Sequence, residues 1–558
     1  MGKTSSPRRA LCGVVWLLAL LAMSCTEDAD SSPDGGGDDA ASSVADAEVG
    51  DRVTTLDATP AGPLVHLSIA LTDRGTVRAS SGAFTCSASP CEYDLPLGTV
   101  VTLEQSTSIG FLGWLDDCRG VGTCSVTLDR PRKVTAMFGR GFGRGLATTV
   151  GPGGDVFVVG EFWGEVSFGC RSTLTSAGGS DIFYLDWLAT TGQCSWFTGY
   201  GGVGDDSARG ATFDAAGNLV IIGSFSSPSL SFGNNKRVTN SNPGSSDIFV
   251  LDVQTGSRAN WAVAFGGPGD DVGHAITRTP TGLVMSGGFE RVAQFGTVQL
   301  TSAGGMDAFV GELSGSGGSA GSVNWLHGYG GAGDDAARGL AVLTSGQLAV
   351  IGDFGASASF GVATLTSAGD QDVFVQQLTP AGVPTWARRW GGPGADVGRG
   401  VTATPGGGLA ASGGFERSAD FGGQSATSAG RTDGFVVATS ADGAVDWVAR
   451  FGGTGADVAT GASFDAGSIW ASGGFEDTVD FGAVGTRSSG GFEDKVLVGF
   501  APATGSVVQA VRSGTAFADS AFAVSFGTTA ATRIRALSGT FFVDAVANGT
   551  SVLDIVLF

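Results

Sequence analysis

The chain has 558 residues, and although 95 are Gly and only 15% are charged, its 35 Phe and 11 Trp recur at regular positions and predict packed strands joined by glycine turns rather than disorder. Its formal net charge of −22 gives an acidic surface that repels phosphate backbones, which excludes a nucleic-acid partner. Three histidines in the whole chain leave little room for histidine-based catalysis or a zinc site, and we predict neither a metal nor a cofactor.

Residues 1–24 predict a secretory signal peptide, because basic residues precede an apolar run over residues 11–23 that is too short to span a membrane. The run ends in AMSC at residues 22–25, which resembles the lipobox of bacterial lipoproteins, although Ala and Met replace the usual Leu and small residue. The resemblance implies lipidation of Cys25 and attachment to the membrane through it; ordinary cleavage that leaves Cys25 free is the alternative. Residues 25–60 contain ten acids and one Arg, and their self-repulsion predicts a disordered acidic tether.

Residues 61–138 change to short alternating segments, which predict a small β module with strands near residues 65–71, 99–103, 124–128 and 133–138. Its four cysteines form two close pairs, and in an exported chain they predict disulfides. Among the three connectivities the local one is favoured. It joins Cys86 to Cys91 and Cys118 to Cys124. A zinc site would need tighter CxxC pairs and a reducing compartment.

This stretch resembles the divergent internalin-type bacterial repeat. The resemblance rests on Gly75-Thr-Val, the Cys86 and Cys91 pair, Pro96-x-Gly98-Thr-x-Val, Phe111-x-Gly-Trp114, Cys118-x-Gly-x-Gly-Thr-Cys124 and Val134-Thr-Ala-Met-Phe138. Members of that family are generally spacers or adhesion modules, so the resemblance implies a module without chemistry of its own.

The rest of the chain is built from one repeat. Its turn, GGxGxD, returns with variations about every 61 to 65 residues, at Gly201, Gly266, Gly330, Gly391, Gly452 and Gly514. Each copy continues with two apolar runs, a Phe-Gly pair, an Asp that opens a third run, and a run that contains Trp. Four short strands per repeat are typical of a β-propeller blade. Alignment of the first strands gives seven copies, at Gly145, Gly210, Ala275, Gly339, Gly400, Gly461 and Ala523.

The glycine turns and the Phe-Gly and Asp-x-Phe-Val segments resemble the bacterial SBBP-type seven-bladed propeller repeat. The resemblance implies an all-β fold, with a seven-bladed propeller over residues 139–558 after the small disulfide-bearing module. The last copy ends with its third strand, residues 554–558, and residues 132–139 look like the missing fourth strand. We therefore predict that residues 132–139 complete blade seven. Because the same segment should close the module, it serves one of the two or both.

Carboxylates recur at two positions of the repeat. An Asp opens the third strand of every blade, where seven copies suit a structural role, such as accepting backbone N–H groups, better than an active site. These residues are Asp181, Asp247, Asp307, Asp372, Asp433, Asp494 and Asp554. The Asp of each GGxGxD turn resembles the start of the RTX calcium nonapeptide, but turns more than sixty residues apart cannot sandwich an ion. We expect these residues to cap turns between blades: Asp206, Asp271, Asp335, Asp396, Asp457 and Asp519.

Basic residues follow the turn at a constant distance. Since the first strand is innermost in a propeller, they predict a ring around the axial channel, which is the one place where we expect a small ligand. The ring comprises Arg144, Arg209, His274, Arg338 and Arg399.

Aromatic residues form pairs four positions apart in five blades, on one face of the fourth strand. We expect them to pack between blades, and exposed platforms for sugars are the alternative. The pairs are Trp196/Tyr200, Trp261/Phe265, Trp325/Tyr329, Trp386/Trp390 and Trp447/Phe451. Cys170 and Cys194 occur only in blade one and predict a third disulfide there.

The sequence thus favours an exported monomer at the outer membrane or cell surface, anchored by lipid, with the periplasmic face an option. We expect a non-enzymatic binding or scaffold protein for a protein or polysaccharide, with no catalytic residues. A propeller hydrolase or lyase acting on extracellular glycans is the alternative, but most acids occupy repeat-locked positions rather than one irregular cluster.

Overall fold

This computed structural model describes residues 63–543 apart from 72–74, 88–89, 107–110, 119–122, 140, 168–169, 171, 189–190, 192, 255–257, 491–492, 514–520 and 529–532. All of them lie in a compact unit that spans Ala58–Phe558. The predicted signal peptide, the lipidation of Cys25 and the acidic tether concern residues outside the described ones, as do Asp519 and Asp554. Among the described residues, no helix is long and apolar enough to cross a membrane.

The small module consists of two four-stranded sheets that face each other. The first sheet has the order β4 (Cys91–Pro96), β1 (Leu64–Leu71), β8 (Arg132–Phe138) and β6 (Phe111–Asp116), and the second has the order β3 (Thr85–Cys86), β2 (Val77–Ala79), β5 (Val100–Gln105) and β7 (Cys124–Thr127). Alternate residues of β1 and β5 point inward, so Leu67, Ile69 and Leu103 are fully buried together with Trp114. The Cys86–Cys91 and Cys118–Cys124 disulfides close short loops at this core, with the pairing that the sequence favours.

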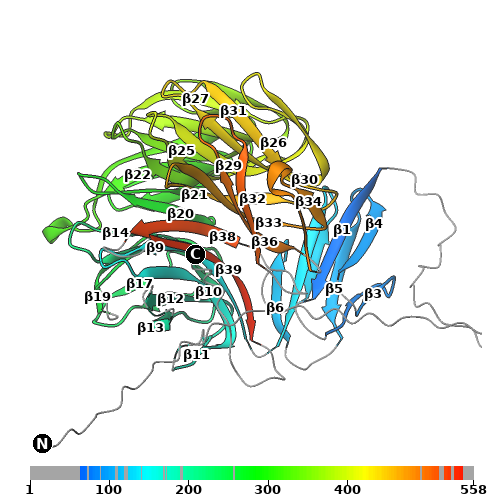
Figure 1. Cartoon of the computed structure of the whole chain (residues 1–558). Helices are drawn as coiled ribbons and strands as arrows, with labels where there is room; N and C mark the ends of the chain where they lie inside the picture. Colours follow the sequence, from blue (N-terminus) through cyan, green and yellow to red (C-terminus); the bar gives the residue numbers. More distant parts are fainter. Residues whose placement is uncertain are drawn as a thin grey trace, which may run out of the picture. The chain divides into compact units, whose positions relative to one another are not determined.

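The propeller is a seven-bladed ring of antiparallel sheets, in which strand order follows chain order (Figure 1). Blade one contains β9 (Gly141–Val150), β10 (Val156–Val166), β12 (Asp181–Leu188) and β13 (Gln193–Tyr200). Blade two contains β14 (Asp206–Phe213), β15 (Leu219–Phe225), β18 (Asp247–Gln254) and β19 (Arg258–Phe265). Blade three contains β20 (Asp271–Arg278), β21 (Leu283–Phe295), β22 (Val298–Leu313) and β23 (Val323–Gly331). Blade four contains β24 (Asp335–Val342), β25 (Leu348–Ser359), β26 (Thr364–Leu378) and β27 (Pro384–Trp390). Blade five contains β28 (Val397–Ala403), β29 (Leu409–Asp420), β30 (Ser425–Thr439) and β31 (Val445–Phe451). Blade six contains β32 (Val458–Asp465), β33 (Ser468–Phe475), β36 (Asp494–Phe500) and β37 (Val507–Ser513).

Blade seven is described in its first two strands, and short extra elements decorate other blades. The blade-seven strands are β38 (Ala521–Thr528) and β39 (Arg533–Val543). The extra elements are β11 (Leu174–Thr175), β16 (Ser229–Ser231), β17 (Arg237–Thr239), β34 (Thr478–Asp480), β35 (Thr486–Ser488) and two 3-10 turns, η1 (Gly317–Ser319) and η2 (Gly482–Val484).

In blades one to six, strands two and three are the most buried, because neighbouring blades cover both of their faces. All seven residues of β15 and of β36 are buried, which is why these strands read as continuous apolar runs rather than as alternating ones. The Cys170–Cys194 disulfide links the segment between β10 and β11 to β13 in blade one, as the sequence predicts.

The aromatic pairs of the fourth strands are the main contacts between blades. In five blades the second member contacts the Phe of the Phe-Gly pair in the following blade, in stacked, tilted or edge-to-face geometry, with ring centroids 5.2 to 6.3 Å apart. These contacts are Tyr200–Phe232, Phe265–Phe295, Tyr329–Phe360, Trp390–Phe421 and Phe451–Phe481. The first member is covered as well: a Cβ on Gly443 would lie 2.9 Å from the Trp386 ring, so the glycine turn of the next blade packs directly on that tryptophan. Packing between blades therefore accounts for these residues better than sugar platforms do.

The carboxylates of the repeat hold the turns between blades. In five blades the Asp that opens strand three accepts the backbone N–H of the residue four positions earlier, as Asp372 does from Ala368 at 3.0 Å, and in blade two Asp247 accepts that of Ser241, six positions earlier. The Asp of the GGxGxD turn accepts two backbone N–H groups; Asp396 receives those of Gly392, at 2.6 Å, and Glu416, at 3.1 Å. This second bond ties the turn to the end of strand two in the same blade.

Blade seven is joined to blade one by a strand pair that the sequence did not predict. Strand β8 pairs in parallel with β1 and in antiparallel fashion with β6, so both of its edges are occupied inside the module. A strand has only two hydrogen-bonding edges, and Arg132–Phe138 therefore does not complete blade seven, contrary to our expectation. Instead the end of β39 pairs with the start of β9, with Val543 opposite Gly141 and Thr540 opposite Arg144, which joins blade seven to blade one.

Candidate functional site in the axial channel

Each innermost strand contains a β-bulge at the same place. In blades two to six the pairing with strand two skips one residue, for example between Ala208 and Gly210. Blade one has the same irregularity opposite Val159 and Gly160, and β38 has it in blade seven. A bulge leaves its extra residue unpaired and redirects the side chain. The residues at the bulge that line the channel are Leu146, Arg209, His274, Arg338, Arg399 and Thr460.

The residue after each bulge is always Gly or Ala, because the inner strands approach one another closely there. A Cβ on Gly400 would lie 2.5 Å from the backbone nitrogen of Ala462 in the next blade. The small residues therefore set the spacing of the ring, and the bulge residues before them carry the side chains that face the axis.

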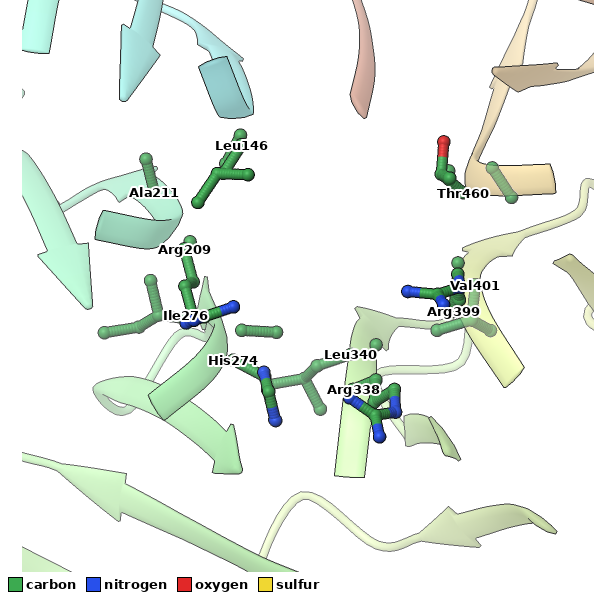
Figure 2. Close-up of a pocket in the computed structure, with 17 residues that line it drawn as sticks. Leu146, Arg209, Ala211, His274, Ile276, Arg338, Leu340, Arg399, Val401 and Thr460 are labelled. Carbon is green, nitrogen blue, oxygen red and sulfur yellow. The ribbon is translucent and has the colours of Figure 1, made fainter. Parts of the chain in front are cut away.

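These side chains surround a cavity of about 300 Å³ on the axis of the propeller. Figure 2 shows Arg209 and His274 on one side of the opening, Arg338 at its edge and Arg399 across from Arg209. Two residues further along their strands, Ile276, Leu340 and Val401 line the same cavity together with alanines. The channel thus has three tiers: a basic tier of Arg209, His274, Arg338 and Arg399, a tier of Gly and Ala at the next position of each strand, and an aliphatic tier of Ile276, Leu340 and Val401.

One member of the predicted ring lies elsewhere. The sequence alignment placed Arg144 with Arg209, but the pairing of Gly145 with Gly160 shows that blade one is displaced by two residues, so that Leu146 occupies the ring position. Arg144 instead forms an ion pair with Glu161, whose side chain is fully buried, and does not line the cavity. The sequence also missed Leu146, Thr460 and the aliphatic tier, because nothing but the register reveals them.

The basic tier gathers three arginines and one histidine around the same cavity. Arg338 is paired with Asp353, which is buried and does not line the cavity. Burial and then the charge of Arg338 lower the pKa of Arg399 to about 10, although its side chain is exposed to the channel. Burial and three neighbouring arginines hold the pKa of His274 well below its usual value, so its imidazole is neutral. In both groups burial is the larger cause, and the charges of the neighbouring arginines add to it.

The lining can hold an anion but offers little else. Guanidinium groups bind carboxylate and phosphate oxygens in a planar, two-pronged geometry, and they do so most strongly where water is restricted. Among the described residues, no cluster of three or more His, Cys, Asp or Glu side chains is arranged to hold a metal ion. The lining of the cavity contains no carboxylate, and the Thr460 hydroxyl donates to the backbone oxygen of Ser472, at 3.2 Å.

Comparison with solved structures gives distant matches only. One is the quinohemoprotein alcohol dehydrogenase from Comamonas testosteroni, with 10% sequence identity, a TM-score of 0.36 and coverage of 86% of this chain and 73% of that chain. Another is a luciferin-regenerating enzyme, with 9% identity, a TM-score of 0.29 and coverage of 62% of this chain and 94% of that chain. No protein-family model matches the chain, and no curated protein matches it. Such likenesses carry no argument about activity, so the function has to be argued from the geometry.

Proposed function

We propose that this protein is a non-enzymatic binding or scaffold propeller of the cell envelope, exported and anchored by lipid on Cys25, whose ligand is a protein or polysaccharide. The basic start of the chain, its apolar run and the AMSC sequence support export and anchoring. The resemblances to SBBP-type and internalin-type repeats, both of surface proteins, support a role in presentation and binding rather than in chemistry.

One observation carries the binding function. The backbone at the channel bulge is the same from blade to blade, but the side chain on it changes: Leu, Arg, His, Arg, Arg and Thr. Positions that serve the fold keep one residue in every copy, as the strand-three Asp does. A position that is constant in geometry and variable in chemistry is where a repeat protein adapts to a ligand.

The alternative, a lyase or hydrolase acting on extracellular glycans, is favoured by a different observation. His274 is neutral and faces the same cavity as the arginines. A neutral imidazole can accept a proton while guanidinium groups neutralise a sugar carboxylate. The lining lacks the second acid or base group that glycan hydrolysis usually requires.

The experiment that tests the proposal is a glycan array probed with the full chain, purified under oxidising conditions, followed by size-exclusion analysis of every polymer that binds. We expect saturable binding that leaves the length of the polymer unchanged. Shortening of the polymer would establish the enzymatic alternative instead. Mass spectrometry of the native N-terminus decides whether Cys25 carries lipid.

A further inference from the structure

We propose that the axial channel binds an amphiphilic anion, a carboxylate or phosphate group on an apolar body, with the anionic head among Arg209, Arg338 and Arg399 and the body against the aliphatic tier. The inference rests on the proposed binding function and names the class of ligand that the channel takes.

The head-group site follows from the charges. Three arginines from three blades line one cavity, in a protein whose net charge is −22. Asp353 pairs with Arg338 from outside the lining, so that the cavity itself is left without a carboxylate. Burial and, after it, the charge of Arg338 disfavour the charged form of Arg399, and an anion in the cavity would stabilise that form against both effects. Arginine is suited to this task because its donors match the two oxygens of a carboxylate or phosphate.

The site for the apolar body follows from the register. Because side chains alternate along a strand, the residue two positions after each bulge faces the axis again. Ile276, Leu340 and Val401 therefore form an aliphatic wall on the same three blades that supply His274, Arg338 and Arg399. The Gly and Ala tier between the two leaves the passage open. A cavity of about 300 Å³ is at the lower end of the range for small-molecule sites, so a head group with a short chain or a single ring fits it.

The test is isothermal titration of the full chain with hexanoate and hexyl phosphate, with acetate and inorganic phosphate as head groups alone and with hexanol as the body alone. We expect at least one six-carbon anion to bind about tenfold or more tightly than its bare head group and than hexanol. The two six-carbon arms show whether a carboxylate or a phosphate is preferred. Equal binding of hexanol and both anions, or no binding of either anion, would overturn the inference.

Two variants locate the site. Arg399→Gln should weaken the preferred anion about tenfold or more, because it removes a charge-assisted hydrogen bond, while Leu340→Asn should weaken the six-carbon anion but leave the bare head group unchanged. The matched control is Arg258→Gln, on the exposed start of β19, which should bind as the wild type does. Circular dichroism and the unfolding midpoint show whether each variant is folded. A folded Arg399→Gln protein with wild-type affinity would also overturn the inference, whereas binding of a glycan with no anion in the channel would leave the broader binding function intact.

Discussion

Replacement of Phe421 by Ala tests whether the aromatic contacts between blades stabilise the propeller. Phe421 is fully buried, and its ring lies 6.3 Å from Trp390 of the preceding blade, 5.7 Å from Phe415 and 5.0 Å from Phe435. Truncation of a fully buried Phe to Ala costs about 3–5 kcal/mol, through lost burial and the cavity left behind. The aromatic pairs lost with it are part of that cost, at about 0.5–1.5 kcal/mol each.

The assay is urea unfolding followed by tryptophan fluorescence, at fixed pH and under oxidising conditions. We expect Phe421→Ala to lower the free energy of unfolding by about 3–5 kcal/mol with little change in the denaturant slope, and Phe421→Leu to cost roughly half as much. Val362→Ala is the matched control: Val362 is 51% exposed on blade four and should change stability by no more than about 0.5 kcal/mol. A loss below about 1 kcal/mol in Phe421→Ala would refute the claim that these rings hold neighbouring blades together.

Three further predictions concern the turns, the disulfide and the ring spacing. Burial, with smaller contributions from neighbouring carboxylates, raises the pKa of Asp396 to about 7 and that of Asp271 to about 8, above the value near 3.9 of an unfolded chain. Between the unfolded and the folded pKa the folded state holds an extra proton at each group, so stability falls by about 1.4 kcal/mol per pH unit and per proton as pH rises from about 4 to about 7, and the slope levels off above the folded pKa values. Asp396→Asn should therefore flatten the slope that urea unfolding measures between about pH 4.5 and 7. Replacement of Cys170 and Cys194 by Ser should cost about 3 kcal/mol, because their disulfide closes a loop with a sequence separation of 24, and an unchanged melting temperature would contradict this. Gly400→Val should lower the yield of folded protein or the unfolding midpoint by more than Gly406→Val, whose Cβ meets nothing within 4 Å.

Much of the fold could be predicted from the sequence because comparison of the copies separates residues that recur in every blade from residues that vary. Residues that return in every copy, such as the strand-three Asp and the Phe of the Phe-Gly pair, were expected to be structural, and in the described blades they hold turns and fill the contacts between blades. The local disulfides followed from the close spacing of the cysteines, which leaves little freedom for other pairings.

The pairing between blade seven and blade one could not be predicted in this way. Residues 132–139 fit the pattern of a fourth strand equally well in the module and in blade seven, and a pattern of alternating side chains does not say which edge the strand joins. Tertiary pairing decides it: β1 and β6 take both edges of β8, and β39 reaches β9 instead.

The site was only partly predictable for a similar reason. A bulge adds one residue without any change in composition, so Arg144 and Leu146 were equivalent candidates until the register of β9 with β10 was known. Arg209, His274, Arg338 and Arg399 do come together, since their blades share one spacing from the glycine turn. The aliphatic tier, two residues further on, consists of ordinary strand residues and carries no signal of its own.

The most direct test of the channel site is a crystal structure of the full chain soaked with 6-bromohexanoate, in which the anomalous signal of bromine locates the ligand. The account predicts a bromine peak against Leu340 and Val401, with the carboxylate oxygens within hydrogen-bonding distance of Arg399. A channel that contains only water while bromine is found elsewhere, or a carboxylate that points away from the arginines, would contradict it.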